Sequence, residues 1–110
     1  MKCPTRLIIL PFVLLAVSCT RDPTVQIQRY VESGNRFRQK GDLNQAIEAF
    51  RRAKLLTPND TTVLLQLALL LHGTGKMDQA KPIYEQILRI QPGHLVALTN
   101  LASIKAIEDR

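Results

Sequence analysis

The sequence has little of what a disulfide-stabilised domain or a nucleotide-binding enzyme needs. It contains no tryptophan, and aromatic residues make up only 5% of its 110 residues. Its two cysteines are Cys3 and Cys19, so no disulfide framework can stabilise the chain after residue 19. It has 5 glycines and no glycine-rich phosphate-binding loop. These absences favour one small domain whose core is built from Leu, Ile, Val and Ala, as in packed helices.

The residues that commonly carry catalysis or bind metals are isolated from one another. Neither His72 nor His94 has a second histidine or cysteine at the spacing of metal ligands, so we expect no metal site and no cofactor. After Cys19 no cysteine is left for thiol catalysis. The acidic residues are scattered and lie mostly at expected helix ends, where capping explains them. We therefore expect that the protein is not an enzyme.

The charge balance is basic, with a formal net charge of +6 at pH 7. Lys2 and Arg6 belong to a leader segment, which leaves about +4 on the rest of the chain. An excess of this size is weak evidence for nucleic-acid binding, and we expect no nucleic-acid partner. One group of basic residues is either a solvated surface or a surface that attracts anionic lipid head groups or an acidic partner. Its members are Arg29, Arg36, Arg38, Lys40, Arg51, Arg52 and Lys54.

Residues 1–18 have the layout of a secretory signal peptide, with a basic start, a short apolar segment and small residues at the end. The apolar segment, 7–17, is shorter than the ~20 residues that a membrane-spanning helix needs. Cys19 follows Ala16, Val17 and Ser18 directly. This ending resembles the lipobox of bacterial lipoproteins, in which the cysteine is lipid-modified and becomes the first mature residue. The alternative is an ordinary cleaved signal followed by a chance cysteine.

The resemblance implies that Cys19 anchors the protein in a membrane and that residues 19–24 form a short lipidated tether. Acyl chains contribute ~0.8 kcal/mol per buried CH₂ group, so a multiply acylated cysteine binds a bilayer durably. By the sorting rule of such lipoproteins, Thr20 after the cysteine favours the outer membrane. We therefore expect a protein on the outer membrane that faces the periplasm. Attachment to the inner membrane and a soluble periplasmic protein are the alternatives.

Shifting the sequence by 34 residues aligns it with itself without a gap. Glycines and prolines recur where helices are expected to end, and alanines, aromatic residues and leucines recur between them. A period of this length indicates a repeat fold. The recurring pairs are Gly41 and Gly75, Ala46 and Ala80, Phe50 and Tyr84, Pro58 and Pro92, Leu64 and Leu98, Leu67 and Leu101, and Ala68 and Ala102.

The period and these residues resemble the tetratricopeptide repeat (TPR), a 34-residue helix–turn–helix unit. The resemblance implies an all-α fold in which antiparallel helix pairs stack as a short right-handed solenoid of five helices. The TPR domain covers residues 25–110, with repeat 1 at 27–60, repeat 2 at 61–94 and a half repeat or capping helix at 95–110. The expected helices are 24–39, 43–56, 61–73, 78–90 and 95–108.

Local chemistry supports these boundaries. Gly41 and Gly75 can adopt the left-handed conformation that ends a helix. Asp42, followed by Gln45, has the spacing of a capping pair for the second helix. Pro82 lies about one turn into the fourth helix, where it should remove one hydrogen bond or tilt the first turn.

The resemblance places a partner on the concave face, which the first helix of each repeat lines. Residues 63–71 are apolar nearly all round, so this helix is either buried on every side or presents an apolar strip to a partner. Burial explains Leu65 and Leu69 least well, and we hypothesise that they floor a groove for a peptide or helix. The concave-face residues are expected to be Gln28, Val31, Asn35 and Arg38, then Leu65, Gln66, Leu69 and His72, and finally Thr99 and Ser103.

The leading interpretation is a lipid-anchored scaffold of the bacterial cell envelope that binds a protein or peptide in its concave groove. The resemblance brings pilus and secretion-system assembly as candidate roles. The alternative is a self-associating structural protein, such as a homodimer, or a shortened relative of a longer TPR lipoprotein. This alternative rests on the repeat number, because stacked repeats generally need ~3 or more units and two and a half are present.

Overall fold

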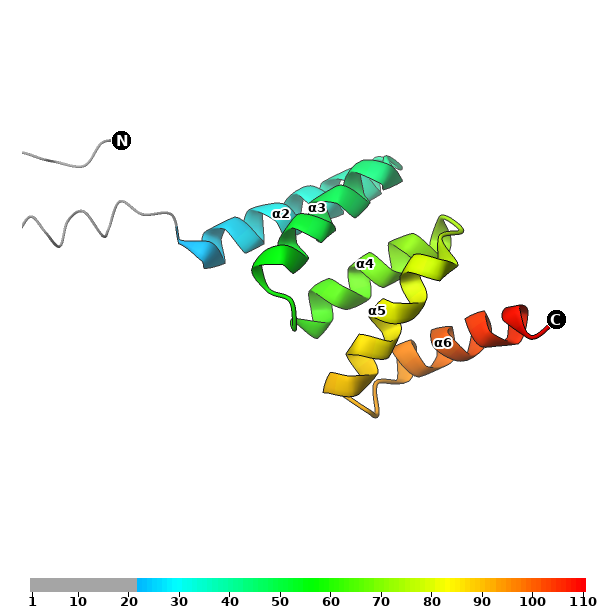
Figure 1. The fold of residues 1–110 in the computed structure, drawn as a ribbon. Helices are drawn as coiled ribbons and strands as arrows, with labels where there is room; N and C mark the ends of the chain where they lie inside the picture. Colours follow the sequence, from blue (N-terminus) through cyan, green and yellow to red (C-terminus); the bar gives the residue numbers. More distant parts are fainter. Residues whose placement is uncertain (1–21) are drawn as a thin grey trace, which may run out of the picture.

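The computed structural model describes residues 22–110; the predicted signal peptide at 1–18 and Cys19 lie outside the described residues. The described residues form five α-helices and no strand (Figure 1). The predicted all-α fold is confirmed, and each predicted helix boundary lies within one residue of the observed one. The helices are α2 (Pro23–Gln39), α3 (Leu43–Leu56), α4 (Thr61–Gly73), α5 (Met77–Ile90) and α6 (Leu95–Glu108).

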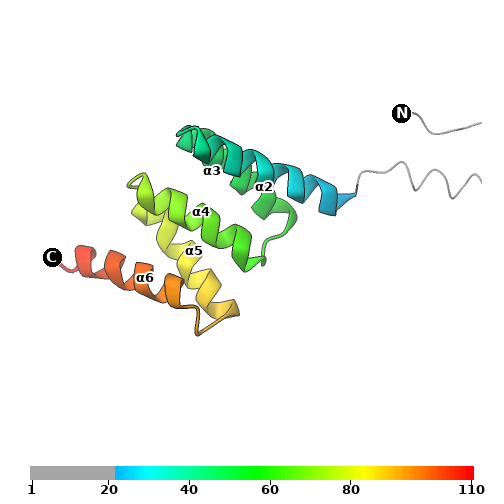
Figure 2. The ribbon, with the colours of Figure 1, turned by 180° about the vertical axis from the view of Figure 1, so that it is seen from behind.

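The helices stack in the order in which they occur in the chain. Helix α2 packs against α3, α3 against α4, α4 against α5, and α5 against α6. In Figure 1 α3 and α5 lie in front of α2 and α4, and from behind, in Figure 2, this order is reversed. We call α2, α4 and α6, the first helices of the repeats, the inner layer, and α3 and α5 the outer layer. This arrangement is that of an all-α TPR solenoid.

The turn inside each repeat is built in the same way. Gly41 and Gly75 have φ angles of 80° and 83°, the left-handed region that favours glycine. Directly after the first glycine, the N–H of Asp42 donates to the carbonyl of Phe37 at 2.9 Å. Lys76 makes the equivalent bond in the second repeat at 2.8 Å. These bonds close the C-terminal turn of the preceding helix, and the predicted left-handed glycines are confirmed.

The predicted capping pair at Asp42 and Gln45 is wrong, because the side chain of Asp42 makes no capping hydrogen bond. Its ψ angle is 75°, set by the tight glycine turn before it, whereas Asp60 at the start of α4 has the extended ψ of 107°. An extended N-cap residue directs its side chain toward the first free N–H groups of the helix. Asp60 accepts from the N–H groups of Thr62 at 2.9 Å and Val63 at 3.4 Å.

The core runs along the stack between the two layers. The recurring small residues Ala46 and Ala80 are fully buried, which lets neighbouring helices approach closely. No polar or charged residue is buried among residues 22–110, so burial of apolar surface is the main stabilising contribution. None of the helices in this range combines the length and the apolar character needed to cross a membrane. The largest fully buried side chains are Tyr84, Phe50, Leu64, Leu67, Leu71, Ile87 and Ile104.

Candidate functional site

Three of the predicted concave-face residues meet where α2 passes α4. The guanidinium of Arg38 in α2 donates to the side-chain oxygen of Gln66 in α4, and to Oδ1 of Asn35 at 2.5 Å. The same guanidinium carbon lies 5.8 Å from the centroid of the Phe50 ring, within the range of a cation–π contact. Arg38 therefore ties the inner-layer helices of the two repeats together.

A recess of about 400 Å³ lies between α2 and α4 and is called the inner groove below. The predicted residues Gln28, Val31 and Gln66 line it, together with the buried Phe50. Asp60 is the one charged residue among those that line it, and its carboxylate already caps α4. The inner groove is thus an apolar recess with two amide side chains. The remaining lining residues are Thr24, Ile27, Thr62 and Val63.

Leu65 and Leu69 lie elsewhere on α4. Both are half-buried and pack against the core cluster of the stack, and neither lines the inner groove. The hypothesis that they floor a partner groove stays a prediction. Thr99 and Ser103 are exposed on α6, and they also lie outside the inner groove.

His72 is engaged inside the protein. Its Nδ1 lies 3.3 Å from the hydroxyl of Tyr84, and the two rings meet edge to face with centroids 5.9 Å apart. Tyr84 is fully buried, and this burial raises the pKa of its phenol to about 12. The hydroxyl of a buried tyrosine needs a hydrogen-bond partner, and half-buried His72 provides one. No local sequence signal links two residues that are 12 positions apart in different helices.

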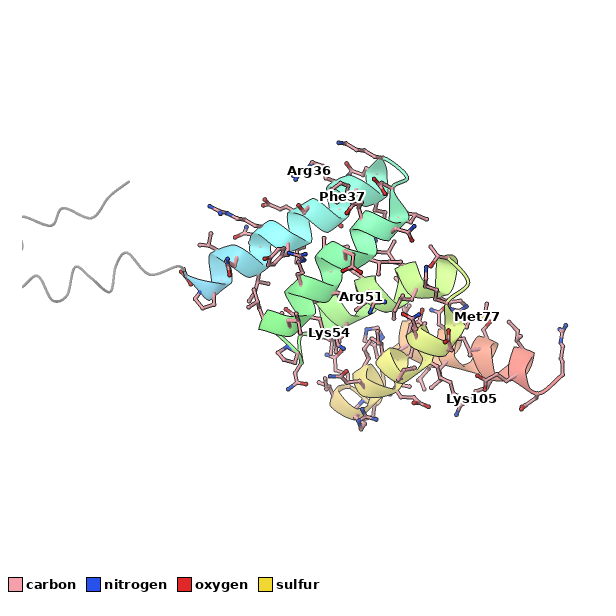
Figure 3. The ribbon with its side chains drawn as sticks, turned by 45° about the horizontal axis from the view of Figure 1, so that its top comes forward. Arg36, Phe37, Arg51, Lys54, Met77 and Lys105 are labelled. Carbon is pink, nitrogen blue, oxygen red and sulfur yellow. The ribbon has the colours of Figure 1, made fainter. Side chains whose placement is uncertain are left out.

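A second recess, of about 1010 Å³, opens on the outer layer and is called the outer groove below. Its walls come mainly from α3 and α5, with side chains of α2 and α4 completing it. Three hydrogen bonds join α5 to the first repeat beside it: Arg51 donates to Gln79 at 2.6 Å, and Gln86 donates to the carbonyl of Pro58 at 3.0 Å and to Oδ1 of Asn59 at 3.4 Å. Figure 3 shows Arg51 on the side of α3 that faces α5. The sequence indicated Arg51, Arg52 and Lys54 as basic surface residues, but neither Arg89 nor the groove.

Models of two repeat families match this chain. One, described as a TPR repeat, matches residues 34–75, and the other, described as a tetratricopeptide repeat, matches residues 61–94. The chain contains tetratricopeptide repeats. The second match coincides with repeat 2 as the 34-residue period defines it. Such repeats commonly bind protein or peptide partners and are typically non-catalytic scaffolds.

The chain is also similar to two much longer curated proteins. It is 29% identical over 90 residues to Protein O-mannosyl-transferase TMTC1 of Homo sapiens and 27% identical over 90 residues to the same-named protein of Mus musculus. Each match covers 82% of this chain and 10% of the relative. The chain therefore spans about a tenth of the length of these relatives.

Within residues 22–110, no group of three or more His, Cys, Asp or Glu side chains is arranged to hold a metal ion.

Proposed function

We propose that this protein is a lipid-anchored TPR scaffold of the bacterial cell envelope that holds a segment of another protein in the inner groove. The observation that carries the proposal is the groove itself, in which Gln28, Val31 and Gln66 line one recess between two repeats. Mannosyl transfer is not part of the proposal, because the similarity covers only 10% of each transferase. The protein acts by binding.

The residues that line the inner groove indicate which chemical groups the partner segment would present. Ile27 and Val31, which are both half-buried, offer apolar surface for one large apolar side chain. Gln66 accepts from Arg38 through its oxygen, which leaves its amide N–H groups to donate to a backbone carbonyl of the partner. Because Arg38 holds Gln66 in place before binding, less side-chain entropy is lost when the partner docks.

Membrane attachment through Cys19 belongs to the same proposal and rests on the signal and lipobox resemblance. Helix α2 begins at Pro23, four residues after Cys19. Four extended residues reach at most roughly 14 Å, so the anchor would hold repeat 1 close to the bilayer. We place the protein on the outer membrane facing the periplasm, where pilus or secretion-system assembly would provide partners.

Lipidation is tested by expressing the full chain in a bacterial host fed with alkyne-tagged palmitate. The wild-type chain should incorporate the label, and Cys19→Ser should lose it. Cys3→Ser is the matched control and should keep the label, because Cys3 lies in the part of the leader that is removed. Mass spectrometry of the mature N-terminus identifies the modified residue. Label that persists in Cys19→Ser would refute the anchor.

Partner binding in the inner groove is tested by site-specific photo-crosslinking in cells. A photoreactive amino acid replaces Gln28 or Gln66 in the groove, and Asn44, exposed on α3, is the control position. We expect the same crosslinked partner from both groove positions and none from the control. The separate hypothesis of an apolar strip is tested by replacing Leu65 and Leu69 with Glu. Because both leucines also pack against the core, lost partner capture supports the strip only if circular dichroism shows unchanged helix content. Crosslinks that form equally from Asn44 would contradict the groove as the site.

One observation favours the second candidate function, self-association. Leu98 on α6 is 43% exposed, whereas its repeat equivalent Leu64 is 0% exposed within the α4–α5 pair. Ala102 is likewise exposed where Ala68 is fully buried. An apolar face of this kind is a surface for a second copy. Sedimentation of the unlipidated mature chain distinguishes the two functions, because a monomer at every concentration would argue against self-association.

A further inference from the structure

We infer that the outer groove is a second binding site, which takes an acidic protein segment that carries an apolar side chain. The inference goes beyond the proposed function, since the inner groove lies between α2 and α4 and the outer groove lies over α3 and α5. A scaffold with both sites bridges two partners, one on each layer. The side chains that line the outer groove indicate the chemistry of the second partner.

The outer groove has a positive charge excess, which the inner groove lacks. Four basic side chains line it against two acidic ones, whereas the one charged residue that lines the inner groove is an aspartate. Complementary charge both attracts a partner and excludes the wrong one. The two grooves therefore select different segments. The basic residues are Arg51, Arg52, Lys54 and Arg89, and the acidic residues are Glu48 and Asp78.

Most of this positive charge is available to a partner. Within residues 22–110, Arg52, Lys54 and Arg89 have no carboxylate within 4.0 Å. Arg51 is already engaged, because its Nε lies 3.7 Å from Glu48 and its guanidinium donates to Gln79 at 2.6 Å, so the available guanidinium groups are those of Arg52 and Arg89. Carboxylates form their strongest hydrogen bonds with such guanidinium groups.

The groove also offers apolar contacts. Leu55, near the end of α3, is 79% exposed and lines the groove beside the basic residues. Leu56 is 40% exposed and adds apolar surface to the same recess, which the nearly buried Leu67, Leu71 and Ile83 also line. A large apolar side chain exposed to water at this position gains free energy when a partner covers it. A partner with an apolar side chain between carboxylates matches both features.

The recessed shape favours a protein segment over an anionic membrane surface. The recess has a volume of about 1010 Å³, which is room for a side chain, and the exposed Leu55 and Leu56 are among the residues that line it. A flat layer of lipid head groups contacts protruding side chains and leaves such a recess empty. Figure 3 shows Lys54 on the same helix as Arg51, so three of the four basic groups come from α3, while Arg89 comes from α5.

The test measures fluorescence anisotropy of a labelled ten-residue peptide, with two leucines flanked on each side by four glutamates, on the full mature chain. Double charge reversal of Arg52→Glu and Lys54→Glu should weaken binding about tenfold or more. The matched control, Arg36→Glu with Lys40→Glu, makes the same charge change outside both grooves and should alter binding less than about twofold. A peptide with serines in place of the leucines should bind more weakly to the wild type.

Three results would overturn the inference. They are no binding of the probe to the wild type, equal loss in both double variants, and binding that is indifferent to the leucines. Vesicles of anionic phospholipid form a separate arm, and affinity for vesicles in place of the peptide would assign the basic surface to the membrane. Crosslinking from Gln28 reports the inner groove independently, so failure here leaves the proposed function testable.

Discussion

The ring of Phe50 lies directly against the backbone of Gly34, where a Cβ atom would be 2.5 Å from the ring carbon Cε2. Real Cβ atoms do not approach other carbons so closely, so glycine alone fits this position. In repeat 2 the equivalent pair is Ala68 and Tyr84, and both are fully buried. The first pair of helices therefore approaches more closely than alanine would allow at this point.

We predict that Gly34→Ala lowers the stability of the domain. Overpacking a tight core costs ~1–3 kcal/mol, and the better helix propensity of alanine returns only about 1 kcal/mol. Phe50 is fully buried, so a shift of its ring would disturb the packing around it. Urea unfolding followed by circular dichroism measures the change. Gly73→Ala is the control, because nothing lies within 4 Å of its Cβ position, and it should be neutral or stabilising. The reverse ranking would contradict the close contact.

We predict that Asp60→Ala destabilises the domain by about 1 kcal/mol, since two N–H groups of α4 lose their acceptor. Asp42→Ala is the matched comparison at the start of α3, where the aspartate makes no capping bond. Its effect on the free energy of unfolding should be clearly smaller. Thermal unfolding of both variants at pH 7 gives the comparison, and equal losses would mean that the capping bond of Asp60 contributes nothing.

We predict a specific loss of stability at alkaline pH that depends on Tyr84. Its folded-state pKa is raised from 10.0 to about 12, so the folded protein keeps the phenol proton after the unfolded chain has lost it. The stabilisation is complete below about pH 10 and falls as the pH rises toward about 12. Tyr84→Phe removes this contribution. The difference in unfolding free energy between wild type and variant should change across this window, and a constant difference would refute it.

We predict that Pro82→Ala stabilises the domain. Helix α5 continues through Pro82, which is exposed. Proline has no backbone N–H, so one hydrogen bond of the helix is not made. Proline is about 3 kcal/mol less favourable than alanine inside a helix, and greater freedom of the unfolded chain offsets up to about 1 kcal/mol. A rise in the midpoint of urea unfolding is expected. A fall would mean that the proline ring makes a stabilising contact in the outer groove that it lines.

The repeat pattern predicted the helices well, because each depends on residues close in sequence. The left-handed turns at Gly41 and Gly75 follow from one residue type and its conformational freedom. The failed capping pair at Asp42 marks the limit of this reasoning. Its residue types suit a cap, but the preceding turn sets the backbone angle, and a cap needs the angle as well as the side chain.

By itself the sequence determined the all-α repeat fold and its helices, since the 34-residue period repeats the same buried faces. Only the tertiary structure decided which polar residues meet. The contacts of Arg38 with Gln66 and of Arg51 with Gln79 each join residues 28 positions apart in different repeats. Such contacts depend on how one helix pair packs on the next, and this packing is a property of the assembled core. For the same reason, Val31 lines the inner groove while Leu65 packs against the core.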